Sequence, residues 1–287
     1  MRFNRIPHIS ELFPTGNPAK KLLCAIILLL TLTSLLAAAD TDANKIHPAA
    51  AEAAGIHEIT AIDPNLTGTD VNVAVICRSF TYRNGRPRND YRPDLRHNCF
   101  DSDKLTFHDS GSPPPGLSPH STAVCSILLG TDPNASAPGI GKFLYRGIIP
   151  EANAHIYELW HFLTDYAYRN IPPQADIITS SMGAPFEDWW TRAIDSLATE
   201  HGLTLIAGIG NGQRLSEPPL YPAAGYNGIA VGVVDSPNSP LDSSRLTSFI
   251  MPTPENSTLG PTADGRCKPD IVAPGNCLAA AYSQPDL

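Results

Sequence analysis

Short apolar runs recur along the chain and are separated by polar stretches rich in turn-forming residues. The first, residues 71–76 with the sequence VNVAVI, is nearly continuous and rich in β-branched side chains, which is typical of a strand buried on both faces. Four similar runs follow, over residues 154–159, 175–180, 203–208 and 228–234. Because helical segments lie between some of these runs, the pattern predicts a doubly wound α/β fold, a mostly parallel sheet with helices on both faces. We expect the first four runs to form adjacent central strands.

Two helices are predicted from their end signals and periodicity. Residues 118–130 open with Ser-Pro and close on Gly130, so a helix should begin near His120. Residues 187–201 carry Trp189, Trp190, Ile194 and Leu197 at helical spacing. We interpret the two tryptophans as core or helix-surface residues and not as a ligand cage.

One longer apolar run, residues 22–39, follows Lys20 and Lys21 and ends in three alanines. A charged start, an apolar stretch and an Ala-x-Ala end are typical of a secretory signal peptide, which predicts export of the protein. The alternatives are an uncleaved membrane anchor and a buried core helix. The predicted organisation is therefore a signal peptide or anchor over 1–39, a linker over 40–60 and one domain over 61–287.

Composition narrows the class of protein. The chain has 287 residues, 42% of them hydrophobic and 17% charged, so it can bury a core without help from metals or disulfides. The net charge of −8, without any Lys/Arg-rich run, argues against nucleic acid as a partner. After removal of 1–39, five cysteines would remain, and their pairing stays open: Cys77, Cys99, Cys125, Cys267 and Cys277. No Cys-x-x-Cys spacing occurs, so no zinc or other metal ligands are assigned.

Several segments together resemble the subtilisin-like serine proteases, the subtilases. The most specific are residues 260–275 (GPTADGRCKPDIVAPG), 205–212 (LIAGIGNG) and 120–124 (HSTAV). Weaker similarities lie at residues 147–154, 181–185 and 221–224. All of them follow the order of that family, and the resemblance covers about residues 62–280.

The resemblance implies a role for several residues. His120 stands at the position of the general base, and Asn211 at that of the side chain that stabilises the oxyanion. Ser181, Met182, Gly183 and Ala184 would offer their backbone to an extended peptide, which would add as a strand. Taken alone, His120 is more typical of a polar surface residue. Asn211 between two glycines is also typical of a simple turn, and residues 181–184 of a strand end.

The chain departs from the family pattern where the acid should follow the first strand, because Cys77 stands there. The family's aspartate orients the histidine and stabilises its charged form, and a neutral thiol would do this poorly. Cys77 is open to three interpretations: a small structural residue, a disulfide partner of Cys125, or a thiol nucleophile.

A second departure lies at the end of the chain. Residues 276–287 contain no Gly-Thr-Ser motif for the family's nucleophile. We therefore expect an incomplete coding sequence, a fold without its C-terminal nucleophile helix, and no peptidase turnover by these 287 residues alone.

Two hypotheses follow. The first is an exported subtilisin-like serine endopeptidase that cleaves peptide bonds by acyl transfer, inactive in the form given. The alternative is a catalytically dead homologue that binds peptides or proteins. Either would have a peptide or protein partner, and a membrane would be a partner only if 22–39 stays uncleaved. No cofactor is assigned; calcium is implied by the resemblance alone, without ligands, because Asp101 and Asp103 are merely two acids in a loop.

The signal-peptide interpretation predicts a mature N-terminus near Asp40, directly after the Ala-rich end of the apolar run. N-terminal sequencing of the secreted protein checks this. Secreted protein that begins at Met1 would contradict it.

Overall fold

The computed structural model describes residues 50–51, 54–78, 82–83, 86–87, 91–111, 116–137, 141–212, 217–234, 249–250, 257–275 and 279–280. The chain divides into two units, Met1–Lys45 and Ile46–Leu287, and every described residue belongs to the second. The predicted signal or anchor segment, 1–39, lies outside the described residues. Among the helices that are described, none is both long and apolar enough to cross a bilayer.

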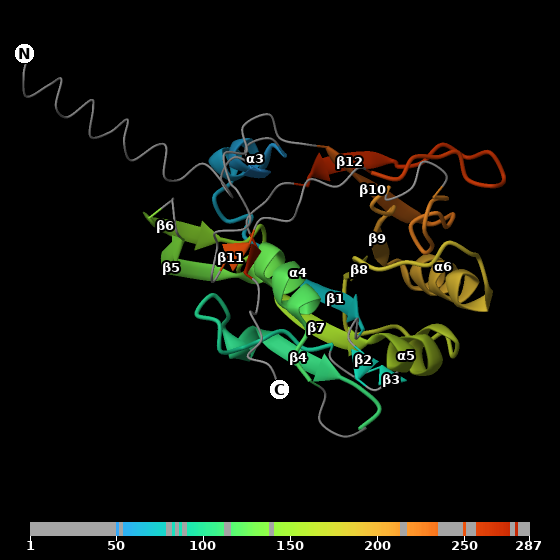
Figure 1. The fold of residues 1–287 in the computed structure, drawn as a ribbon, viewed down its shortest axis with the longest axis horizontal. Helices are drawn as coiled ribbons and strands as arrows, with labels where there is room; N and C mark the ends of the chain where they lie inside the picture. The colour runs from blue at the N-terminus through green and yellow to red at the C-terminus, as the bar shows by residue number, and fades with distance from the viewer. Residues whose placement is uncertain are drawn as a thin grey trace, which may run out of the picture. The chain divides into compact units, whose positions relative to one another are not determined.

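The second unit is built on a seven-stranded sheet with the strand order β12-β10-β9-β8-β1-β7-β4 (Figure 1). Its strands are β1 (Asn72–Cys77), β4 (Leu105–His108), β7 (Asn153–Glu158), β8 (Ile177–Ser180), β9 (Thr204–Gly208), β10 (Gly228–Val234) and β12 (Ile271–Pro274). All neighbouring strands in this sheet pair in parallel. The predicted α/β fold class is confirmed, and β7, β1, β8 and β9 are adjacent as the apolar runs indicated.

Alternate residues of β1 face different helices, which explains why this strand is apolar throughout. Ala74 and Ile76 pack in a cluster with side chains of η3 (Phe162–Ala167, a π-helix) and α6 (Trp189–His201). Val73, Val75 and Cys77 pack in a second cluster, which contains residues of α4 (Pro119–Leu129). A strand covered on both faces has no polar side, so its sequence cannot alternate.

The two predicted helices form close to their expected ends. In α4, Ser118 is the N-cap and Pro119 occupies the first turn, where its missing N–H costs nothing. Asp188 caps α6 reciprocally with Thr191 in a capping box. This helix ends at Gly202, whose φ of +67° is the left-handed conformation that glycine adopts without strain.

The apolar pattern did not predict the remaining elements, which are short or rich in polar residues. They are α3 (Ile56–Ile62), β2 (Tyr82–Arg83), β3 (Arg86–Pro87), η2 (Ser102–Lys104), β5 (Thr131–Ala137), β6 (Gly141–Arg146), α5 (Leu159–His161), β11 (Phe249–Ile250) and β13 (Ala279–Ala280), besides β4, η3 and β12. The strand β5 has the sequence TDPNASA, which is rich in residues that strands usually disfavour. It pairs with β6 in a separate two-stranded sheet, in which Asp132 and Ala135 of β5 and Phe143 and Tyr145 of β6 are buried.

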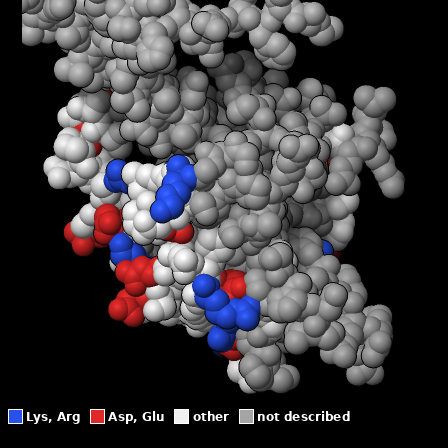
Figure 2. All heavy atoms as spheres, turned by 60° about the vertical axis from the view of Figure 1, so that its left-hand side comes forward, with Lys and Arg blue, Asp and Glu red and all other residues white. Residues whose placement is uncertain are grey.

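Charged side chains of both signs are mixed over the described part of one face (Figure 2). A basic patch of one sign, which nucleic-acid binding requires, does not form on that described area.

The cysteines in the described residues carry free thiols. Cys77, Cys99 and Cys125 are buried and Cys267 is exposed, while Cys277 lies outside the described residues. A disulfide between Cys77 and Cys125, one of the alternatives left open by the sequence, is therefore not formed in this structure.

Two histidines meet across the edge of the main sheet. The Nε2 atom of His108 on β4 lies 3.1 Å from Nδ1 of His155 on β7. Burial lowers the pKa of both imidazoles, and the charges of His155 and His161 lower the pKa of His108 further, against an opposing effect of Asp109. The folded protein therefore favours the neutral form of both rings.

This histidine pair predicts acid sensitivity. The unfolded chain binds protons near the ordinary imidazole pKa of 6.5, whereas the folded chain binds them only at lower pH. The free energy of unfolding should therefore be highest above pH 6.5 and fall as the pH drops through the lowered pKa values. Urea unfolding at about pH 7.5 and about pH 5.5 measures this difference, and the double variant His108→Gln/His155→Gln should reduce it. An equal difference in the variant would contradict the assignment.

Candidate active site

Three strands of the sheet end level with one another. Ile76 of β1 pairs with Ser180 of β8, and Ser180 pairs with Ala207 of β9. The residues that follow, Cys77, Ser181 and Gly208, therefore lie in one row at the carboxyl edge. Ligands of open parallel sheets bind outside this edge, which makes it the candidate site.

Cys77 and His120 meet at this edge. Cys77 is the last residue of β1 and only 1% exposed. His120 lies in the first turn of α4, which the Ser118 side chain fixes by accepting a hydrogen bond of 3.1 Å from the backbone N–H of Ser121. The Sγ atom of Cys77 lies 3.5 Å from Nδ1 of His120. The first turn of α4 thus places the imidazole of His120 beside the end of β1.

Burial favours the neutral forms of both partners. It raises the pKa of the Cys77 thiol, and the hydroxyls of Ser121 and Ser118 oppose this only in part. It lowers the pKa of His120, against a smaller raising effect of the Ser181 backbone. The pair is therefore a thiol beside a neutral imidazole, and not a thiolate beside an imidazolium.

Two nearby carboxylates, Asp94 and Asp109, are paired with arginines and not with His120. Asp94 is buried and forms an ion pair of 2.8 Å with Nε of Arg96. Desolvation by burial raises the pKa of Asp94, but the hydrogen bonds and charge of Arg96 together outweigh it, so the pKa is lowered. Asp109 accepts hydrogen bonds from the Tyr91 hydroxyl at 2.6 Å and from Arg92 at 2.9 Å. These contacts compensate both charges locally.

Asn211 lies in a tight loop after β9. The side chain is exposed, and its neighbours Gly210 and Gly212 have φ values of +120° and +63°. The backbone N–H of Thr258 donates to the carbonyl of Gly210, and Thr258 Oγ1 accepts from the N–H of Gly212, both at 3.0 Å. A Cβ atom on Gly210 would lie 2.6 Å from this Oγ1. Glycine and the buried Thr258 together fix the loop that presents Asn211.

The segment Ser181–Ala184 continues β8 along the same edge. Ala184 and Tyr221 form an antiparallel bridge, in which each backbone N–H donates to the carbonyl of the other, at 3.0 and 2.9 Å. Gly183 allows the two segments to approach, because a Cβ atom there would lie 2.7 Å from the side chain of Leu220. The segment is therefore held on its Tyr221 side.

An apolar cavity of about 140 Å³ adjoins this segment. Its lining residues are Ile76, Arg78, Leu159, Trp160, Leu163, Ser180, Met182, Gly183, Ala184, Phe186, Trp190, Ile194 and Pro222. Trp160 and Phe186 are 61% and 56% exposed, so they form the outer part of the lining. Trp189 is not among these residues and stacks edge-on against Tyr168 instead.

The sequence-predicted residues all lie at or just beyond the carboxyl edge of the sheet. Cys77 and His120 are in direct contact, and the Ser181 backbone affects the pKa of the same imidazole. Asn211 follows the next strand, three residues beyond Gly208. Met182, Gly183 and Ala184 line the cavity.

Sequence reasoning missed Thr258 and Trp160. Thr258 precedes the most specific motif by two residues, but no local pattern links it to Gly210, 48 positions earlier. Trp160 left a signal that was overlooked, since it directly follows the run at 154–159. A large aromatic residue just beyond the carboxyl end of a parallel strand is a candidate for ligand contact.

The described residues offer no group of three or more His, Cys, Asp or Glu side chains able to hold a metal ion. Asp101 instead caps η2, because its side chain accepts a hydrogen bond of 3.1 Å from the N–H of Asp103.

The model of the subtilase family, peptidase S8, matches residues 34–286. Serine protease AprX of Bacillus subtilis (strain 168) is 29% identical over 164 residues, which cover 49% of this chain and 35% of that protein. The chain thus matches about a third of the length of this curated relative.

Similar solved structures include the prenylagaramide maturation protease PagA, with 23% identity, a TM-score of 0.47, and coverage of 79% of this chain and 74% of that chain. Another is the psychrophilic subtilisin-like protease Apa1 from the Antarctic psychrotroph Pseudoalteromonas sp. AS-11, with 19% identity and a TM-score of 0.44 over 63% of this chain and 40% of that one. The match of the family model over nearly the whole chain decides the assignment: this protein belongs to the subtilase family of peptidases.

Proposed function

We propose that this subtilase binds an extended peptide along Ser181–Ala184 and takes part in its hydrolysis by acyl transfer. The observation that supports this most directly is the common row of strand ends, where Cys77, Ser181 and Gly208 follow paired residues. A base, a peptide-binding edge and an oxyanion donor must lie within a few ångströms of one scissile bond. Three strand ends in one row are suited to that arrangement.

In this proposal, His120 is the general base and Asn211 donates to the oxyanion. Because Nδ1 of His120 faces Cys77, the proton of the attacking serine hydroxyl, the nucleophile that the family resemblance implies, would be taken at Nε2. Burial keeps the imidazole neutral and therefore able to accept that proton. The fixed loop around Asn211 would place its amide in advance, which is what stabilisation of a developing charge requires.

The apolar cavity supports a preference for one bulky apolar side chain of the peptide. It is lined by Met182, Gly183 and Ala184, so a strand added along this segment would point alternate side chains towards it. A cavity of about 140 Å³ suits one such side chain. Backbone pairing would supply affinity and the cavity would supply specificity.

Cys77 favours a second candidate function, a peptide-binding domain with little or no hydrolysis. The thiol is buried and neutral, so it adds no negative charge beside an imidazolium. In serine proteases, loss of the aspartate lowers the rate on the order of 10⁴. Peptide binding does not depend on that charge and would be retained.

We also propose export through residues 1–39, with an uncleaved anchor as the alternative.

Peptide binding can be tested with two exposed tryptophans. Trp160 lines the cavity, whereas Trp189 does not, and both are substantially exposed, so neither substitution should unfold the protein. We expect Trp160→Ala to weaken binding of an apolar peptide about tenfold, or about 1.4 kcal/mol, and Trp189→Ala to leave it unchanged. Calorimetric titration with acetylated alanine tetrapeptide amides that carry one phenylalanine measures this. Equal effects of the two variants, or no binding by the wild type, would contradict the proposal.

The role of Cys77 can be tested by restoring a carboxylate. In Cys77→Asp, the pKa of His120 should rise above its wild-type value, because a nearby negative charge stabilises the imidazolium. Cys77→Asn is the control of the same shape without charge, and it should not raise the pKa. NMR titration of the His120 ring provides the measurement, with circular dichroism to verify folding. If the aspartate variant binds peptide and shows the raised pKa but cleaves no faster, the binding-domain candidate is favoured.

A further inference from the structure

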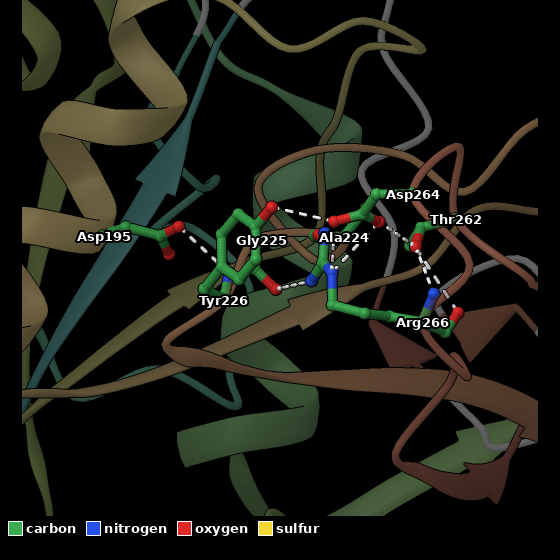
Figure 3. A network of polar contacts seen from close by, with 7 residues as sticks. All are labelled: Asp195, Ala224, Gly225, Tyr226, Thr262, Asp264 and Arg266. Atoms are coloured by element: carbon green, nitrogen blue, oxygen red, sulfur yellow. Dashed lines mark hydrogen bonds and ion pairs between the residues drawn. The ribbon is translucent and has the colours of Figure 1, made fainter.

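A polar network outside the proposed site holds the turn that precedes β10 (Figure 3). At its centre, Arg266 donates from Nη1 to the carbonyl of Gly225 and from Nη2 to that of Ala224, both at 2.8 Å. The guanidinium also stacks over the ring of Tyr226, 3.9 Å from its centroid. One side chain thus contacts three consecutive residues of the turn. Only the planar fork of arginine can make both carbonyl contacts and the stacking contact at once.

Asp264 orients this arginine. Its Oδ2 atom accepts a hydrogen bond of 2.9 Å from Nε of Arg266 and one of 2.7 Å from the Tyr226 hydroxyl, and Oδ1 accepts from Thr262. The hydrogen bond from Thr262, followed by those from Arg266 and Tyr226, holds the pKa of Asp264 well below its usual range. The carboxylate therefore stays charged across the physiological pH range.

Asp195 of α6 holds the same turn from the opposite side, as Figure 3 shows. Its carboxylate accepts from the backbone N–H groups of Tyr226 at 2.9 Å and Asn227 at 3.3 Å. A Cβ atom on Gly225 would lie 2.7 Å from Asp195 Oδ1, so glycine permits this close approach. The turn is thus fixed between a helix and the loop that precedes β12.

The clamped turn leads directly to the proposed peptide-binding edge. The N–H of Ala224 donates to the carbonyl of Leu220 at 2.8 Å, and the N–H of Leu220 donates to the carbonyl of Ile209 at 2.9 Å. The next residue, Tyr221, forms the bridge to Ala184. A shift of the turn would therefore displace both the partner of Ala184 and the support of the loop that carries Asn211.

We infer that Arg266 is a positioning residue for peptide recognition, acting through the turn of residues 220–226 on Ala184. This inference rests on the proposed peptide-binding function. Arg266 does not line the cavity, yet in this inference it contributes to the affinity for an extended peptide. Its negative partner Asp264 is the residue that directs the guanidinium to the turn.

The test compares Arg266 and Lys268, two basic side chains of the loop that precedes β12. Arg266→Lys keeps the charge but loses the fork, so peptide affinity should fall about tenfold and the amides of Ala184 and Tyr221 should exchange faster with solvent. Lys268→Met is the control, because Lys268 contacts the carbonyl of Gly228 at 3.2 Å and Asp270 at 2.6 Å, at the start of β10 and not at the turn. That variant should lower thermal stability without a matching loss of affinity.

The whole chain and the same tetrapeptide amides serve for titration, with hydrogen exchange as a second measurement. Asp195→Ala, which releases the turn from its other side, should weaken binding in the same way even if Arg266→Lys folds poorly. Unchanged affinity in Arg266→Lys and Asp195→Ala, or an equal loss in Lys268→Met, would overturn the inference. If the wild type binds no peptide, the proposed function fails, whereas faster exchange at Ala184 and Tyr221 would still establish the clamp.

Discussion

The hydrogen-bond ladder that joins β1, β8 and β9 is the constraint on which the candidate site depends. Parallel pairing of Ile76 with Ser180, and of Ser180 with Ala207, fixes the height at which each strand ends. A register slip of one residue would turn the side chains of a strand to the opposite face of the sheet. It would also shift the end of that strand relative to the ends of its neighbours. Burial of β1 on both faces opposes such a slip, because Ile76 and Cys77 pack in different apolar clusters.

The electrostatics of the site follow from the same burial. A strand end covered by helices is poorly solvated, and this raises the pKa of Cys77 and lowers that of His120. An aspartate at this position would bring a charge into the apolar environment, stabilised mainly by its interaction with the histidine. The cysteine avoids the desolvation cost, but the imidazolium then gains no electrostatic partner from this position. Stability of the core and stabilisation of a charged intermediate therefore make opposite demands on residue 77.

Loops outside the sheet determine how precisely the edge is presented. Thr258 holds the glycine loop around Asn211 through two backbone contacts, and Arg266 holds the turn that leads to Tyr221. Both supports come from the segment between β10 and β12, far along the chain from the residues they position. Such contacts reduce the number of conformations open to a loop, which is the physical meaning of preorganisation.

The apolar runs determined the central strands by themselves, because strands covered on both faces must be apolar throughout. The motifs that identified the family are also local. Gly-Asn-Gly at 210–212 and the helix start at His120 are each defined by a few consecutive residues. The edge strand β4 is short, and in the hairpin β5–β6 the buried residues, such as Phe143 and Tyr145, alternate with exposed ones, so neither forms a continuous apolar run. The pairing of Ala184 with Tyr221, the contact of Thr258 with Gly210 and the neutral state of the Cys77–His120 pair depend on residues tens of positions apart. Only the tertiary structure decided these features, because burial and hydrogen-bond geometry arise when distant segments pack together, and no local stretch of sequence encodes them.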